Sequence, residues 1–161
     1  MPLLGGGGGS QALPWLRLTM NATQTMATAS TRLVSWDTVS ASYAWPVPTA
    51  PVTNITLPYS GLVAIDVHDC DWGDTGAVAF NPGLYTRRNG DVATLRAGVI
   101  YNATNATAKV VQSMSKIMSF TAGEYLEIRV GHDYGTDLEV AIVEIWLRYI
   151  QMGTFPTTGV N

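Results

Sequence analysis

The most constraining feature of the sequence is its last apolar segment, Leu138 to Ile150, in which ten of thirteen residues are apolar. Its Val, Ile, Trp and Tyr side chains favour a β-strand over an amphipathic helix, and no helix cap precedes it. In such a strand the odd positions are Ala141, Val143, Ile145, Leu147 and Tyr149, and the even positions are Leu138, Val140, Ile142 and Trp146, interrupted by Glu144 and Arg148. A strand packed against one core shows polar residues on its other face. Two apolar faces therefore predict that the second face meets another sheet or another subunit.

Shorter alternating segments occupy most of the preceding chain. They predict strands at residues 15–20, 32–39, 54–57, 62–68, 84–86, 92–95, 109–120 and 125–130. Turn sequences separate them, notably Pro58-Tyr59-Ser60-Gly61 and the hairpin pair Asn89-Gly90, whose residues tolerate positive φ. About eight to ten short strands with such turns predict an all-β, antiparallel β-sandwich or barrel.

We expect three parts along the chain. Residues 1–12 form an extended N-terminal arm that contains Gly5, Gly6, Gly7, Gly8 and Gly9. Residues 13–152 form one β domain, and residues 153–161 form a C-terminal tail. The proline-rich stretch 45–51 reads as a loop inside the domain, because it does not separate two cores.

Composition argues against several classes of protein. The net charge is −3 and only two residues are lysine, so no basic stripe exists to bind nucleic acid. The single cysteine, Cys70, cannot form an internal disulfide or supply a two-sulfur zinc site, and we expect a free thiol.

The amino terminus lacks the basic region of a secretory signal, and no apolar run is long enough for membrane insertion. We expect no cofactor.

The densest polar cluster is His68-Asp69-Cys70-Asp71-Trp72-Gly73-Asp74. Asp69, Asp71 and Asp74 offer hard oxygen ligands for calcium, but the spacing is not that of an EF-hand, so polar turn residues are the favoured interpretation. No catalytic set is complete: no serine is placed beside a histidine, and the neighbours His132 and Asp133 would point to opposite faces of a strand. The sequence therefore predicts a protein that is not an enzyme.

Two tryptophans are candidates for ligand binding. Trp45 and Trp72 fall in predicted loops, where an indole can stack on a sugar, whereas Trp36 and Trp146 are better explained by packing. Four Asn-x-Thr triplets begin at Asn21, Asn54, Asn102 and Asn105. Without a secretory signal we interpret these triplets as ordinary strand and turn sequence.

Four segments together carry a likeness to a known fold: Arg32 to Asp37, Ile55 to Ile65, Leu84 to Ala93 and Phe120 to Ile128. Their order of strand, Pro-x-x-Gly turn, Asn-Gly hairpin and Gly-Glu turn resembles the jelly roll of tumour-necrosis-factor-type and complement-type globular heads. Versions without cysteine pairs are similar to minor tail proteins and head decoration proteins of tailed bacteriophages.

This resemblance implies a homotrimer whose inner sheets pack round a three-fold axis. The expected interface comprises Tyr125, Ile142, Glu144, Trp146 and Arg148, with Glu144 and Arg148 either pairing between subunits or acting as ordinary edge charges. It also implies a structural role in the virion, with the glycine arm docking on neighbouring virion proteins. The alternative is a module that binds a host-surface carbohydrate.

Overall fold

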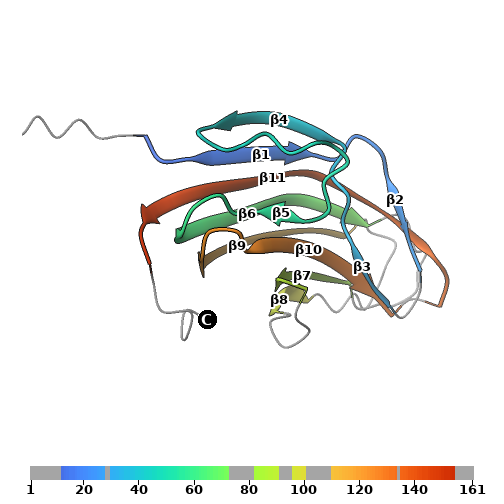
Figure 1. Cartoon of the computed structure of the whole chain (residues 1–161). Coiled ribbons are helices and arrows are strands. Elements are labelled where there is room, and N and C mark those ends of the chain that lie inside the picture. Colours follow the sequence, from blue (N-terminus) through green and yellow to red (C-terminus); the bar gives the residue numbers. More distant parts are fainter. Residues whose placement is uncertain are drawn as a thin grey trace, which may run out of the picture.

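The structure is a computed structural model that describes residues 12–27, 30–72, 82–90, 96–100, 110–133 and 135–154. Eleven strands form two antiparallel sheets, and these residues contain no helix (Figure 1). The strands are β1 (Trp15–Thr19), β2 (Gln24–Met26), β3 (Ser30–Leu33), β4 (Thr38–Tyr43), β5 (Ile55–Thr56), β6 (Gly61–Trp72), β7 (Gly83–Arg88), β8 (Arg96–Ile100), β9 (Val110–Phe120), β10 (Tyr125–His132) and β11 (Leu138–Met152). The predicted all-β class is confirmed.

The two sheets stack as a sandwich (Figure 1). Sheet A has the order β4-β1-β11-β6-β9, and β2 pairs with the start of β11. Sheet B has the order β3-β10-β7-β8, and β5 pairs with the start of β10. The inner faces of both sheets meet in one core that includes Trp36, Leu16 and Ile128, each 0% exposed. No helix in the described part of the chain is long and apolar enough to cross a membrane.

The turn predicted at Asn89-Gly90 forms. Asn89 has a φ of 49° and Gly90 a φ of 67°, and both values lie in the left-handed region that these residue types tolerate. The turn follows β7, and β7 pairs antiparallel with β8, with Tyr85 opposite Ala97. The strand predicted at residues 92–95 lies outside the described residues.

The strand predicted at residues 32–39 is instead two strands in different sheets. β3 belongs to sheet B and β4 to sheet A, so the chain crosses between the sheets at residues 34–37. The crossing is fixed by Trp36, which is fully buried and exchanges backbone hydrogen bonds with Val52. The alternation of side chains along the sequence continues through residues 34–37, so the pattern gave no sign that one strand ends and another begins there.

β11 has two apolar faces because it changes the face that it turns toward the core. Its buried residues are Leu138, Val140 and Ile142 in the first half, and Ile145, Leu147 and Tyr149 in the second. β6 changes its core-facing side at the same level, because Val67 and Cys70 are both buried although they are three residues apart. Val67 pairs with Ile145, and Cys70 pairs with Ile142. Asp69, with a φ of 52°, lies at the switch. The register of β6 against β9 shifts between Val67 and Cys70, and such an irregularity reverses the alternation of a strand. Most of the apolar side chains of β11 therefore pack in the core of their own chain. This corrects the inference that its second apolar face requires a partner.

Candidate functional site

The outer face of sheet A carries a row of side chains that lie directly opposite one another on neighbouring strands. Arg17 of β1 pairs with Trp146 of β11, Trp146 pairs with Asp66 of β6, and Asp66 pairs with Ser115 of β9. Directly paired residues in an antiparallel sheet point to the same face. Residues far apart in sequence thus form one continuous surface that faces away from the core.

Two tryptophans and an ion pair form the centre of this surface. The rings of Trp15 and Trp146 are stacked with centroids 5.6 Å apart, and the guanidinium of Arg17 lies 5.2 Å from the Trp146 centroid. Glu144 accepts hydrogen bonds from Arg17 Nε at 2.6 Å and from Trp146 Nε1 at 2.7 Å. The carboxylate therefore fixes both the cation and the indole.

The electrostatics of Glu144 follow from these contacts. Burial alone would raise the pKa of its carboxyl group, but hydrogen bonds from Trp146 and Arg17 and the charges of Arg17 and His68 hold the pKa below its usual value. Glu144 is thus ionised at neutral pH and satisfied within its own chain.

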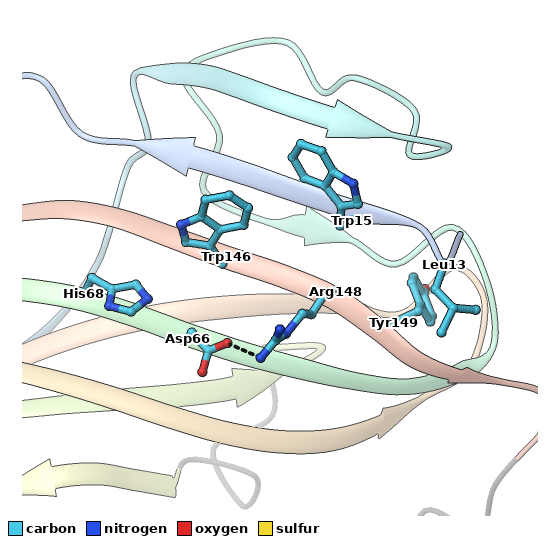
Figure 2. A pocket seen from close by; sticks show the side chains of 7 residues that line it. All are labelled: Leu13, Trp15, Asp66, His68, Trp146, Arg148 and Tyr149. Carbon is cyan, nitrogen blue, oxygen red and sulfur yellow. Dashed lines mark ion pairs between the residues drawn. The ribbon is translucent and has the colours of Figure 1, made fainter. Parts of the chain in front are cut away.

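An open groove of about 650 Å³ lies beside this centre. Figure 2 shows its lining side chains on β6, on β11 and on or just before β1, with Trp15 and Trp146 on one side and the Asp66–Arg148 ion pair beside them. The ion-pair atoms are 3.6 Å apart, and the Ser115 hydroxyl also donates to Asp66. The groove is lined by Leu13, Trp15, Asp66, His68, Trp146, Arg148 and Tyr149.

Exposed apolar side chains continue the surface toward both edges of sheet A. Tyr43 on β4 is 45% exposed and pairs with Trp15. Ile117 on β9 is 45% exposed, and Ile150 near the end of β11 is 42% exposed. We call the outward side chains Tyr43, Trp15, Arg17, Glu144, Trp146, Arg148, Asp66, Ser115 and Ile117 the sheet A face.

The predicted interface residues divide into three groups. Glu144, Trp146 and Arg148 lie together on the sheet A face. Ile142 is 0% exposed in the single chain and packs in its core, which corrects its placement in an interface. Tyr125 belongs to β10 of sheet B, where it pairs with Thr56, so it does not share a surface with the other residues.

Both predicted ligand-binding tryptophans are core residues. Trp72 is the last residue of β6, is 0% exposed, and donates to Gln112 Oε1 at 2.8 Å. Trp45 is 5% exposed and packs against the ring of Tyr149 with centroids 5.4 Å apart. Neither indole presents a face to a ligand, which corrects the prediction; a loop position in the sequence did not imply exposure.

The polar cluster around Asp69 and Asp71 does not assemble into a metal centre in the described structure. Asp69 is exposed and Asp71 is partly exposed, Asp74 lies outside the described residues, and the described chain holds no group of three or more potential ligands. His132 is buried, with Nε2 2.9 Å from the Met26 carbonyl oxygen. Cys70 is a buried free thiol whose pKa is raised by burial and by the charge of Asp71.

Sequence reasoning missed Trp15, Arg17, Asp66 and His68 as members of a site. The alternation pattern could have found them, because Trp15 and Arg17 alternate with the core leucines Leu16 and Leu18, and Asp66 and His68 alternate with the core residues Ile65 and Val67. Alternation identifies the outward face of each strand. It does not reveal which strands are neighbours, so β1, β11 and β6 could not be joined into one surface.

Comparisons with known proteins then identify the fold. No protein-family model and no curated protein match the chain. Among solved structures, the tumour necrosis factor Eiger from S. frugiperda matches 92% of this chain and 99% of its own, at 12% identity and a TM-score of 0.58. The globular domain of the zebrafish complement 1qA protein matches 87% of this chain and 99% of its own, at 13% identity and a TM-score of 0.60. The chain has the jelly-roll fold of these proteins.

The jelly-roll assignment confirms the fold expected from the four sequence segments. At 12% and 13% identity the likeness concerns the fold alone. The sheet A face is therefore interpreted from its own chemistry. The glycines of the predicted docking arm, Gly5 to Gly9, lie outside the described residues.

Proposed function

We propose that this jelly-roll domain is a non-enzymatic structural module that assembles as a homotrimer through the sheet A face. The observation that carries the proposal is that this face combines apolar surface with ionic groups already paired inside the chain. Arg17 is bonded to Glu144, and Arg148 is paired with Asp66. Burying a charge is costly unless it is paired. Paired charges beside stacked indoles make this face suited to burial against another copy.

Self-association is tested by the mass of the purified chain in solution. Light scattering after size exclusion should give three times the 17.3 kDa mass of the chain. Ile117→Arg places an unpaired charge on the sheet A face and should shift the protein to monomer. The matched control is Thr56→Arg, also at an exposed strand position but on sheet B, which should remain trimeric. A monomeric wild-type protein would overturn the proposal.

We further propose that the trimer is a component of a bacteriophage virion, as a minor tail or capsid decoration protein, and that it binds other virion proteins. The support is the sequence likeness described above together with the single cysteine and the uncharged glycine arm. Mass spectrometry of purified particles should detect the chain in a fixed stoichiometry. Its presence only in the lysate of the infected host would contradict the virion assignment.

A second candidate function is carbohydrate binding in the groove. Indole faces next to Asp66, Arg148 and His68 match the way proteins hold sugars, with stacking on one side and polar contacts on the other. Trimer assembly and sugar binding predict different results for the mass and the glycan binding of the purified chain in solution. Saturable binding of a host-surface glycan by a monomer, lost in Trp146→Ala, would favour the sugar site, since burial of the sheet A face in a trimer covers the groove.

A further inference from the structure

The outer face of sheet B carries a compact group of charged side chains. On β10, Leu126 and Ile128 are 0% exposed and point into the core, so Glu127 and Arg129 point to the outside. Arg87 of β7 lies directly opposite Glu127 in the strand register and therefore shares this face. We call Arg87, Glu127 and Arg129 the sheet B triad. It lies on the side of the sandwich away from the sheet A face.

Both arginines of the triad share one carboxylate. Glu127 Oε2 lies 3.4 Å from Arg129 Nη1 and 3.7 Å from Arg87 Nε. The Glu127 side chain is only 9% exposed, and each arginine side chain is 18% exposed. Two guanidinium charges against one carboxylate leave a positive charge that is not neutralised within the triad, in a chain whose net charge is −3. A poorly solvated charge without a counter-charge is costly, so the triad favours a bound anion.

Neighbouring charges do not change this balance. The guanidinium of Arg88 lies 5.1 Å from the centroid of Phe120 and donates to the Ser119 carbonyl, both on β9 of the other sheet. The carboxylate of Glu124 accepts from the Thr121 N–H and from the Asn89 amide. Neither group contacts the triad, so within the described residues its surplus positive charge stays uncompensated.

Arg87 is the member of the triad with donors to spare. Arg129 is held on two sides, because Nη1 donates to Glu127 and Nη2 donates to the Thr31 carbonyl at 3.1 Å. Arg87 makes no hydrogen bond within the described part of the chain: its Nε is buried without a partner, and 3.7 Å to Glu127 is longer than a hydrogen bond. A guanidinium has five N–H donors in a planar fork that fits a carboxylate.

A tyrosine hydroxyl lies next to the triad. Tyr125 precedes Glu127 by two positions on β10 and therefore shares its face. A β-carbon on Gly90 would lie 2.8 Å from the Tyr125 hydroxyl and 4.0 Å from Glu127 Oε1. Because Gly90 has no side chain, the phenol can lie against the turn that follows β7. Its hydroxyl is a second donor on the same side of the turn as the Glu127 carboxylate.

We propose that the sheet B triad binds a monoanionic carboxylate ligand, with Arg87 as the main donor and the Tyr125 hydroxyl as the second. One uncompensated positive charge matches a monoanion, whereas a dianion would leave surplus negative charge beside Glu127. The site depends on neither the trimer nor the virion function. Burial of the sheet A face in a trimer would leave it open, because sheet B forms the other side of the sandwich (Figure 1).

The test titrates the isotope-labelled full-length chain with sodium acetate or sodium glucuronate at constant ionic strength and follows the arginine Nε–H resonances by NMR. Both salts should shift the Arg87 resonance saturably, with a dissociation constant on the order of 1–10 mM. Glucose, which has no carboxylate, should cause no shift, and inorganic phosphate should bind more weakly than acetate. Tighter binding of glucuronate than of acetate would identify the ligand as a sugar acid, and equal binding would identify it as a small carboxylic acid.

Three variants locate the site. Arg87→Gln should weaken acetate binding about tenfold or more, and Tyr125→Phe about threefold, because each removes a donor to the carboxylate. Arg32→Gln is the matched control, since it removes the same charge from an exposed position of β3 that pairs with the inward-facing Val130. Its affinity should stay within about twofold of the wild type.

Three results would overturn the proposal. The absence of a saturable shift in the wild type would leave the triad as an ion-pair cluster with a structural role only. Equal losses in Arg87→Gln and Arg32→Gln would show non-specific attraction of anions. Tighter binding of phosphate than of acetate would exclude the monoanionic carboxylate. If Arg87→Gln does not fold, the wild-type titration and Tyr125→Phe decide the question.

Discussion

The indole nitrogen of Trp146 donates a 2.7 Å hydrogen bond to Oε1 of Glu144, two positions earlier on the outer face of β11. The other carboxylate oxygen accepts from Arg17 on β1. One partly buried carboxylate therefore orients an aromatic ring and a cation on the neighbouring strand. This arrangement makes the sheet A face a defined surface in the isolated chain, before any partner binds.

Stability should depend on pH through Glu144. Its folded-state pKa lies below the usual value, so its stabilising contribution is present above the unfolded pKa and is lost as the pH falls through the folded pKa. Urea unfolding of the wild type should therefore show a falling midpoint as the pH drops below about 4.5. Glu144→Gln should have a lower midpoint at pH 7 and a weaker dependence in the acid range. Equal pH profiles for the two proteins would contradict the role of this carboxylate.

Stability should also fall at alkaline pH because of Tyr149. Burial raises the pKa of its hydroxyl to about 12, against the opposing hydrogen bond to Tyr59. A raised folded-state pKa means that the contribution is complete below the unfolded value of about 10 and is lost as the pH rises toward 12. Tyr149→Phe should remove this loss, and at pH 7 it should cost about 1–2 kcal/mol through the missing hydrogen bonds. Thermal unfolding monitored by circular dichroism at pH 7, 10 and 11 measures both effects.

Because β11 changes the side that it turns toward the core, replacing isoleucine by alanine at positions 142 and 150 should change stability by unequal amounts. Ile142→Ala removes a side chain with 0% exposure and should reduce the free energy of unfolding by about 2–5 kcal/mol. Ile150→Ala removes one that is 42% exposed and should cost less than about 1 kcal/mol. Chemical denaturation of both variants is the measurement. A larger loss for Ile150→Ala would show that the core-facing side of β11 is assigned incorrectly.

The buried tryptophan at the end of β6 should act on stability and not on binding. Trp72→Phe removes the indole donor to Gln112 inside the core and should lower the free energy of unfolding by about 1–3 kcal/mol. The oligomeric mass should not change. A variant that folds with wild-type stability but has lost affinity for a glycan would restore Trp72 as a ligand-binding residue.

Cys70 should be chemically inert in the folded protein. The thiol is buried, and burial together with the charge of Asp71 raises its pKa, so the reactive thiolate is scarce at neutral pH. Iodoacetamide at pH 8 should leave the native chain unmodified and should alkylate it in denaturant. Mass spectrometry distinguishes the two. Rapid labelling of the native protein would show that β6 opens locally at the switch near Asp69.

Much of the fold could be predicted because the responsible interactions are local. Alternation separated Leu16 and Leu18 from Trp15 and Arg17 on opposite faces of one strand, of which the structure buries the leucines, and the conformational freedom of Asn89 and Gly90 located a turn. The long strand at residues 138–150 was also predicted correctly in type. Each of these properties depends on neighbouring residues and on the period of a strand, which the sequence contains directly.

Only the tertiary structure determined which strands became neighbours and which of their faces point into the core. The reversal of alternation in β11 depends on its pairing with β6, where Val67 and Cys70 are matched to Ile145 and Ile142. The burial of Trp72 depends on β9, which supplies Gln112 from forty positions further along the chain. The meeting of Arg17 with Glu144 depends on the pairing of the first strand with the last. Strand neighbours and register are set by the packing of the whole chain, and a period-two pattern specifies the face of each strand without specifying its partner.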